Sequence, residues 1–206
     1  LDRLVKSYIE SVTGDEVVFS WQGGEPTLLG LDFFRKVVAF QQRHAKGGQR
    51  IENDLQTNGT MLDEDWARFL KQHRFLVGLS IDGPREIHDH YRITKRAEPT
   101  FDKVFAAAKM LHKHGVRFNT LTCVHRYNAS KPLDVYRFLR REVGSTYIQF
   151  IPIVEIKGFE NIAPGAWDTA NLPIVGDPRC HPDHPESVVT PWSVAADEYG
   201  YFLCKI

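Results

Sequence analysis

The clearest indication of the fold lies in residues 75–84, which read Phe75-Leu76-Val77-Gly78-Leu79-Ser80-Ile81-Asp82-Gly83-Pro84. Residues 75–81 form a mostly apolar run with the length of one strand, and the turn residues at 82–84 end it. A run of this kind is typical of a strand that is buried on both faces, which is the usual state of a strand in a parallel sheet. This stretch therefore predicts a parallel sheet that is covered by helices.

Similar strands, separated by amphipathic helices, are predicted on both sides of this run. The predicted strands are residues 17–21, 51–57, 75–81, 116–124 and 146–154. The predicted helices are residues 1–9, 31–44, 63–70, 100–111, 130–139 and 193–206. Strand and helix alternate about five times, which predicts an α/β fold with helices outside a mainly parallel sheet. The spacing favours a (β/α) barrel or part of one, and a flat doubly wound sheet is the alternative.

Capping residues and apolar periodicity define the helices of this prediction. Asp63, Thr100 and Ser130 are suitable N-caps for the three helices that they precede. The apolar face of the first helix is expected to contain Leu1, Leu4, Val5, Tyr8 and Ile9. The inner face of the helix after Ser130 is expected to contain Leu133, Tyr136 and Leu139. Residues 156–190 show no clean periodicity and are interpreted as a long loop.

The composition argues against several classes of function. The 206 residues include 26 basic and 26 acidic residues, so a nucleic-acid partner recruited by bulk charge is not expected. No apolar stretch approaches the about 20 residues that span a bilayer, so no membrane partner is expected either. The three cysteines (Cys123, Cys180 and Cys204) are odd in number and unclustered, which favours a reducing cytoplasm over a disulfide framework.

Several polar or glycine-rich stretches follow the predicted strands directly. They are Gln22-Gly23-Gly24-Glu25, Asn58-Gly59, Ser80-Ile81-Asp82-Gly83 and Ile151-Pro152-Ile153-Val154. The carboxyl ends of parallel strands lie at one edge of a sheet, where ligands of α/β proteins bind. We therefore expect these stretches to share one rim, although each also has a simple interpretation as a turn.

Four residues of this rim carry groups that suit a small zwitterionic ligand. The carbonyls around Gly24 can accept hydrogen bonds from an ammonium group, and Glu25 can add a charge-assisted bond. Ser80 can donate to a ribose or a carboxylate. Arg92 can hold a carboxylate in a bidentate fork, although most arginines are simply solvated.

A metal site is not expected from the remaining candidate ligands. His88 and His90 alternate with acidic residues and lack a third ligand at a suitable spacing. Cys180, His181 and His184 provide three candidates, whereas a closed structural zinc site requires four ligands.

Three motifs together resemble the radical S-adenosylmethionine (SAM) superfamily. They are residues 19–27 (Phe-Ser-Trp-Gln-Gly-Gly-Glu-Pro-Thr), residues 55–60 (Leu-Gln-Thr-Asn-Gly-Thr) and residues 77–84 (Val-Gly-Leu-Ser-Ile-Asp-Gly-Pro). With His88 and Arg92 downstream, they resemble the anaerobic sulfatase-maturating enzymes in the branch with a C-terminal SPASM domain. The resemblance extends from residue 1 to about residue 154 and resumes weakly near residues 188–206.

The resemblance implies a partial (β/α)6 radical SAM barrel that is incomplete at its first strand. Residues 1–155 would form the barrel core, residues 156–190 a long loop and residues 191–206 the terminal helix, without a SPASM domain. The family oxidises a cysteine or serine of an unfolded sulfatase segment to formylglycine. It uses a [4Fe-4S] cluster, SAM and the 5′-deoxyadenosyl radical, and it takes electrons from a donor such as a flavodoxin or a ferredoxin.

The resemblance also implies roles for individual residues. Gly23, Gly24 and Glu25 would meet the amino group of SAM, with Asn58 on the same rim. Ser80 and Arg92 would hold the ribose or carboxylate end. Val154 would lie beside the adenine through its backbone, and Gln22 would face SAM or the peptide.

The sequence departs from the family pattern in two respects. The family motif of three cysteines is absent, and we expect it immediately before Leu1 in a longer parent chain. Neither it nor the proton-accepting aspartate of the C-terminal domain is present, so no catalytic residue or cluster ligand is assigned and this polypeptide alone is expected to be inactive. Residues 17–21 should then form an exposed edge strand.

Three alternatives remain open from the sequence. They are another radical SAM enzyme that modifies peptides, a non-catalytic barrel scaffold that binds peptides without a cluster, and an ordinary barrel enzyme that binds phosphate at the rim.

Overall fold

A single parallel sheet organises the chain. The computed structural model describes residues 1–158, 173–174 and 176–206. Its strands are β1 (Glu16–Trp21), β2 (Arg50–Thr57), β3 (Leu76–Ser80), β4 (Arg117–Val124) and β5 (Ile148–Pro152). All neighbouring strands pair in parallel, in the order β1-β2-β3-β4-β5. The five predicted strands are thus confirmed. A doubly wound sheet would reverse its strand order at a switch point, so the sequential order identifies part of a barrel.

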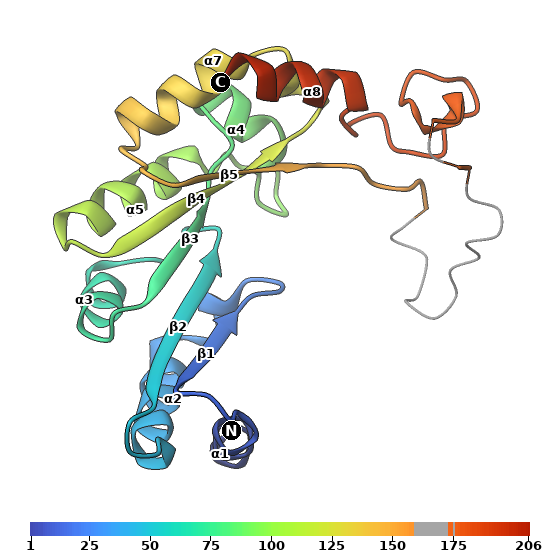
Figure 1. The fold of residues 1–206 in the computed structure, drawn as a ribbon. Coiled ribbons are helices and arrows are strands. Elements are labelled where there is room, and N and C mark those ends of the chain that lie inside the picture. The colour runs from blue at the N-terminus through green and yellow to red at the C-terminus, as the bar shows by residue number, and fades with distance from the viewer. Residues whose placement is uncertain (159–172, 175) are drawn as a thin grey trace.

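Helices connect the strands. Figure 1 shows that the sheet is strongly twisted and where the helices lie along it. The helices are α1 (Asp2–Ser11), α2 (Leu31–His44), α3 (Glu64–Gln72), α4 (Arg85–Tyr91), α5 (Phe101–Lys113), α6 (Arg126–Ala129), α7 (Pro132–Arg137) and α8 (Ala196–Lys205). Shorter turns are η1 (Pro26–Leu29), η2 (Phe138–Glu142) and η5 (Pro178–Cys180). The short helix α4 was not predicted, because its seven residues are mostly polar and show no apolar period.

The main core lies between one face of the sheet and the helices that cover it. Side chains from α2, α3, α5 and α7 pack in one cluster with the strands; examples are Phe34, Trp66, Leu111, Val135, Leu55, Val77 and Phe118. The opposite face of the sheet carries accessible polar side chains; these include Ser20, Asp54, Gln56, Asn119 and Gln149. This alternation along each strand leaves the concave face free and directs attention to its rim.

The strand β1 lies at an edge of the sheet, as predicted for residues 17–21. Helix α1 covers it only partly. Val5 and Ile9 are fully buried, whereas Leu4 and Tyr8 are exposed. Tyr8 nevertheless contacts β1, because its ring packs edge-on against Phe19 with centroids 4.8 Å apart and its hydroxyl donates to Val18 O at 2.9 Å. The predicted apolar face is therefore only partly buried.

The three predicted N-caps have different outcomes. Asp63 caps α3 as expected, with its Oδ1 accepting a hydrogen bond from Trp66 N at 2.9 Å. Helix α5 does begin after Thr100, but the Asp89 carboxylate caps it by accepting from the backbone N–H groups of residues 100 and 101. The N-cap predicted at Ser130 is wrong, because residues 126–129 form the separate helix α6 and Ser130 ends it.

The predicted inner face of the next helix is also partly wrong. Leu133 is exposed, and the buried positions of α7 and η2 are Pro132, Val135 and Leu139. The buried Pro132 and Val135 each lie one residue before the predicted Leu133 and Tyr136, which corresponds to about 100° around the helix, whereas Leu139 is buried as predicted.

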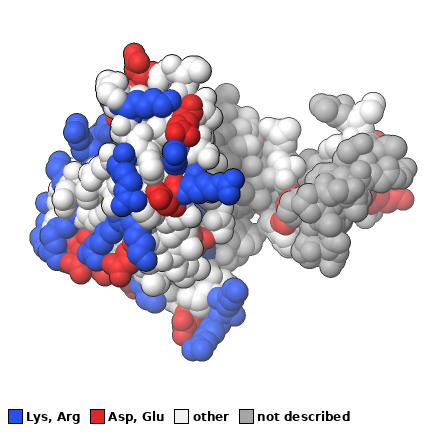
Figure 2. Space-filling view, turned by 90° about the horizontal axis from the view of Figure 1, so that it is seen from below, with Lys and Arg blue, Asp and Glu red and all other residues white. Residues whose placement is uncertain are grey.

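Charges of both signs are mixed on the molecular surface. On the face drawn in Figure 2, lysine and arginine side chains adjoin aspartate and glutamate side chains. Among the described residues, no helix has the length and apolar character needed to cross a membrane. The predicted loop at 156–190 contains η5 and a backbone bridge between Ile156 and Val189, while residues 159–172 and 175 lie outside the described residues. The division into core, loop and terminal helix stays a prediction.

Candidate functional site at the rim of the sheet

The structure places the predicted site residues along the carboxyl-terminal ends of the strands. Residues 22–25 follow β1, Asn58 follows β2, and Ser80 is the last residue of β3. Arg92 ends α4, and Val154 lies just beyond β5. Because adjacent parallel strands end at one edge, residues distant in sequence lie along a single rim (Figure 1).

The turn after β1 exposes its backbone. Gly23 and Gly24 have φ values of +95° and +57°, a region that side-chain-bearing residues adopt at a cost. A Cβ atom added at either glycine would meet no heavy atom within 4 Å. The glycines are therefore required by the backbone conformation, and open space remains around them for a ligand. Gln22 is exposed beside them.

The Glu25 carboxylate connects two turns of the rim through hydrogen bonds. Its Oε1 accepts hydrogen bonds from Thr27 N at 3.1 Å, Thr27 Oγ1 at 2.6 Å and Thr57 Oγ1 at 2.7 Å. Its Oε2 accepts from Asn58 N at 2.7 Å. The carboxylate thus links the turn after β1 to the turn after β2. Only Oε2 retains acceptor capacity for an additional donor.

Asn58 and Val154 occupy different kinds of position on the rim. The Oδ1 of Asn58 accepts from the backbone N–H and the hydroxyl of Thr60, at 2.9 and 2.7 Å, which is a local turn. Its side-chain amide hydrogens have no partner in the described part of the chain. Val154 is exposed at the opposite end of the rim.

A buried ion pair lies at the ends of β3 and β4. The carboxylate of Asp82, with a side chain only 3% exposed, accepts from Arg92 Nε at 2.6 Å and from Arg92 Nη2 at 3.0 Å. It also accepts from Cys123 N at 2.8 Å. Burial alone would lower the pKa of the Arg92 guanidinium, but the neighbouring carboxylate raises that pKa above its usual value.

The Cys123 thiol belongs to the same cluster. Arg92 Nη2 lies 3.3 Å from its Sγ. Burial raises the pKa of this thiol, and the nearby Asp82 carboxylate raises it further, so the thiol is protonated at neutral pH. Arg92 thus uses Nε and Nη2 within the protein, and its Nη1 is the nitrogen without a partner among the described residues.

The ion pair forms one wall of a cavity of about 460 Å³. The cavity is lined by Asp82, Tyr91, Arg92, Cys123, His125, Ile153 and Trp192. Of the predicted site residues, only Arg92 lines it; neither Gly24 nor Ser80 does. The predicted residues therefore occupy one rim but do not share this cavity.

Most of the cavity residues were not predicted as site residues. Asp82 was interpreted as a turn residue, although its place directly after the central strand was a usable signal. His125 also follows a strand directly, yet a single histidine gives no periodic signal of burial. Trp192 reaches the cavity only because the segment before α8 is fastened to the strand ends: Arg126 N donates to Trp192 O at 3.1 Å and Val194 N to Ile153 O at 2.8 Å.

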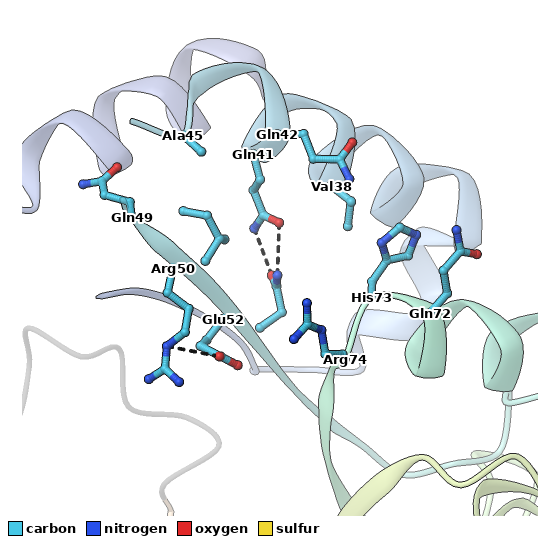
Figure 3. A pocket seen from close by; sticks show the side chains of 12 residues that line it. Val38, Gln41, Gln42, Ala45, Gln49, Arg50, Glu52, Gln72, His73 and Arg74 are labelled. Atoms are coloured by element: carbon cyan, nitrogen blue, oxygen red, sulfur yellow. Dashed lines mark hydrogen bonds and ion pairs between the residues drawn. The ribbon is translucent and has the colours of Figure 1, made fainter. Parts of the chain in front are cut away.

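A second cavity, of about 490 Å³, lies at the opposite ends of the strands, between α2, the start of β2 and the end of α3 (Figure 3). Its most buried polar groups satisfy each other. Gln41 Nε2 donates to Asn53 Oδ1 at 2.9 Å, and Asn53 Nδ2 donates to Gln41 Oε1 at 3.0 Å. Because these amides already have partners, this cavity is the weaker candidate for a ligand site.

The cysteines of this chain do not fit an iron–sulfur cluster. Cys123 lies in β4, Cys180 in η5 and Cys204 in α8, and all three are free thiols. Three thiolates must converge to hold a cluster. The described residues contain no group of three histidine, cysteine, aspartate or glutamate side chains that would hold a metal. No reaction step is therefore derived from a cluster held by these residues.

Comparisons with known proteins identify the family to which this chain is similar. The sequence profile of the radical SAM superfamily matches residues 1–139. The serine-type anaerobic sulfatase-maturating enzyme of Bacteroides thetaiotaomicron is 38% identical over 207 residues, covering 100% of this chain and 46% of that enzyme. The cysteine-type enzyme of Clostridium perfringens is 42% identical over 165 residues, covering 78% of this chain and 44% of that enzyme. The chain thus spans about half the length of these relatives.

Solved structures give the same result for the fold. Native anSMEcpe with bound AdoMet and Kp18Cys peptide matches with a TM-score of 0.77 and 34% identity, over 99% of this chain and 49% of that chain. SuiB of Streptococcus suis bound to its precursor peptide matches with a TM-score of 0.53 at 12% identity, over 72% of this chain and 31% of that chain. The second likeness concerns the fold alone. The fold expected from the sequence, a partial (β/α) barrel, is confirmed.

Proposed function

We propose, for a chain that belongs to the radical SAM superfamily, that its rim binds SAM and that the longer protein oxidises a cysteine or serine of a sulfatase to formylglycine. The observation that carries this proposal is the similarity, over the length of this chain, to relatives named as serine-type and cysteine-type anaerobic sulfatase-maturating enzymes. A structure similar to this chain contains both AdoMet and a peptide. Such a ligand has an ammonium group, a carboxylate, hydroxyls and a flat base, and the rim has groups that suit each of them.

The turn after β1 suits the ammonium group of SAM. Gly23 and Gly24 expose their carbonyls in open space, and Glu25 Oε2 retains one acceptor position beside them. Since Glu25 holds the turns after β1 and β2 together, its main contribution is to fix these acceptors before the ligand arrives. Fixed acceptors do not lose conformational entropy on binding, which favours affinity.

The other end of the rim suits the remaining polar groups of SAM. Arg92 Nη1 is available for a carboxylate because Asp82 engages the other nitrogens and fixes the plane of the guanidinium. Ser80 supplies a hydroxyl for the ribose or the carboxylate, and Asn58 supplies two amide hydrogens. Val154 offers backbone groups to the adenine. Gln22, exposed beside the glycines, faces SAM or the peptide.

SAM, when bound and reductively cleaved in this superfamily, supplies the carbon radical that removes a hydrogen atom from the peptide substrate. The residues of this chain orient it and limit the access of water. The described cysteines hold no cluster, so its ligands must come from another part of the longer protein. The electron donor in this proposal is a small protein such as a flavodoxin or a ferredoxin. We place the protein in the cytoplasm, since its three described cysteines are free.

Anaerobic reconstitution of the longer protein with iron and sulfide tests this function. After chemical reduction, we expect SAM to yield 5′-deoxyadenosine, and a sulfatase peptide with a target serine to lose two hydrogen atoms by mass spectrometry. In a peptide with cysteine at that position, the side chain would instead lose its sulfur, and the carbon that carried the sulfur would become the aldehyde carbon. If reduced protein with a full cluster produced no 5′-deoxyadenosine, the proposal would be refuted.

Paired variants connect this test to the rim. Arg92→Lys keeps the positive charge but removes the planar guanidinium group. We expect it to weaken SAM binding about tenfold, which is the effect of losing one charged hydrogen bond. Arg96→Lys, in the exposed loop before α5, makes the same change away from the rim and should leave affinity unchanged. Equal affinities for both variants would show that another residue holds the carboxylate.

A further inference from the structure

His125 is a buried side chain with unused hydrogen-bonding capacity. The residue follows β4 directly and is only 3% exposed. Neither Nδ1 nor Nε2 has a hydrogen-bond partner among the described residues. Leaving a buried polar group unpaired costs about 1–3 kcal/mol. A buried imidazole without a partner therefore points to a group that the described residues do not supply.

Hydrogen bonds hold the backbone around His125 in place. His125 N donates to Asn128 Oδ1 at 2.9 Å, and its carbonyl accepts from Asn128 N at 3.1 Å and from Ala129 N at 3.0 Å. The imidazole packs edge-on against Tyr91, with ring centroids 4.6 Å apart and an interplanar angle of 84°. The ring is thus fixed by its neighbours while its nitrogens stay unpaired.

The walls of the cavity suit a flat aromatic group. His125 lines the cavity of about 460 Å³ together with the aromatic rings of Tyr91 and Trp192 and the aliphatic side chain of Ile153. Trp192 Nε1 donates to Glu155 Oε2 at 2.6 Å, which holds the indole in place. The Asp82–Arg92 ion pair forms the polar side of the same cavity. Aromatic and aliphatic walls with a few polar groups are typical of sites for small molecules, and flat walls of this kind suit a heteroaromatic base.

The protonation state of the imidazole supports the same kind of ligand. Burial lowers the pKa of His125 to about 4, so the ring is neutral at neutral pH. A neutral imidazole carries one N–H donor and one acceptor nitrogen, which matches the mixed donors and acceptors on the edge of a purine. A cationic ring would instead favour an anion.

We propose that His125 is a specificity-determining residue that hydrogen-bonds the edge of the adenine base of SAM, with the base held in the cavity walled by Tyr91 and Trp192. This inference rests on the proposed function, because it assigns one part of the SAM ligand to one part of the rim. Ile153, which lines the cavity, precedes Val154, so the base would lie beside the residue already proposed to contact it.

Competition binding with the two halves of SAM tests the inference. The longer protein, with its cluster reconstituted, would be titrated with SAM, 5′-deoxyadenosine and methionine. We expect His125→Phe, which keeps a flat ring and removes both nitrogens, to weaken SAM and 5′-deoxyadenosine about tenfold and to leave methionine unchanged. His125→Gln, which keeps a donor and an acceptor, should retain most of the affinity. His73→Phe is the matched control, because His73 packs on Phe69 with ring centroids 4.7 Å apart and lines the cavity at the opposite ends of the strands.

The outcomes separate this inference from the proposed function. If the wild-type protein bound no SAM, the proposed function would fail. If the wild type bound SAM and His125→Phe bound SAM and 5′-deoxyadenosine equally well, this inference alone would be wrong. An equal loss of methionine and 5′-deoxyadenosine would also overturn it, since that pattern indicates a general disturbance of the site. Should His125→Phe fail to fold, His125→Leu serves in the same titrations.

Discussion

Two cavities of nearly equal size lie at opposite ends of the strands, and they differ in how their buried polar groups are satisfied. In the cavity of about 490 Å³ beside α2 and β2, Gln41 and Asn53 pair with each other, and Trp21 Nε1 also donates to Asn53 Oδ1 at 2.9 Å. In the cavity of about 460 Å³ at the rim, Asp82 and Arg92 pair, but His125 has no partner. Cavity size therefore does not distinguish the two, whereas unused hydrogen-bonding capacity does.

This difference has a physical consequence for folding and function. A closed set of hydrogen bonds contributes to stability and leaves nothing for a ligand. An unpaired buried group costs stability and regains it when a ligand supplies the partner. The hydrogen bonds of the cavity beside β2 thus contribute to stability, while the unpaired imidazole of the rim cavity lowers stability and is available to the ligand that we propose.

The largest expected effect concerns the ion pair of the rim cavity. Asp82→Ala leaves the largely buried Arg92 guanidinium unpaired, and we expect it to lower the free energy of unfolding by about 3–5 kcal/mol. Asp102→Ala is the matched control, because Asp102 pairs with Arg85 at the surface, where solvent screens the pair, and its loss should be much smaller. Urea denaturation measures both. Similar losses in the two variants would contradict the buried role of Asp82.

The second effect is a loss of stability in mild acid. Burial lowers the pKa of both His88 and His125 from 6.5 to about 4. In the unfolded chain these two histidines take up protons at a higher pH than in the folded protein. The free energy of unfolding is therefore unaffected by them above pH 6.5 and falls as the pH decreases from 6.5 toward 4. Each histidine should account for about 2 kcal/mol of lost stability at pH 5.

Variants at these two positions sharpen that prediction. His125→Phe should remove about half of the acid-dependent loss between pH 7 and 5, as measured by urea denaturation at several pH values. His181→Phe, at an exposed position that does not line the rim cavity, should leave the profile close to that of the wild type. A wild-type profile without any slope in this range would contradict the buried neutral state of both rings.

The third effect concerns the cavity beside β2. Asn53→Ala deprives Gln41 and Trp21 Nε1 of their partner, and we expect a loss of about 2 kcal/mol in the free energy of unfolding. SAM affinity of the longer protein should be unchanged, because this cavity lies at the other ends of the strands. Weakened SAM binding with an intact fold would show that the two cavities are not independent.

The smallest effect has the opposite sign. In the absence of ligand, His125→Phe removes two unpaired polar atoms from a buried position, so we expect it to stabilise the protein by about 1 kcal/mol near pH 7. Thermal or urea denaturation measures this gain. Destabilisation by the same substitution would indicate that the imidazole already has a partner in the folded protein.

The sequence predicted the strands and the location of the rim better than the contacts within it. Apolar runs such as residues 75–81 identify strands because a strand buried on both faces has few alternatives. The face of α7 was predicted less well, because the exposed Leu133 was counted as buried. The buried Pro132 and Val135 each precede a predicted position by one residue, and one residue corresponds to about 100° around a helix, so a small error in phase becomes an error in the face.

Tertiary contacts explain the rest of what the sequence did not reveal. Asp82 and Arg92 are ten positions apart and meet only because α4 folds back over the end of β3. Glu25 was expected to bind a ligand directly, but most of its acceptor capacity goes to Thr27, Thr57 and Asn58. The unpaired nitrogens of His125 depend on the packing of Tyr91 and on the segment around Trp192, and no local pattern encodes that environment.

The most direct test of the account is a structure of the longer protein in complex with SAM. The account predicts one nucleotide along the rim, with its amino group within hydrogen-bond distance of the carbonyls of Gly23 or Gly24. The adenine edge would then contact a ring nitrogen of His125. A complex in which SAM touches neither the turn after β1 nor the cavity beside His125 would contradict it.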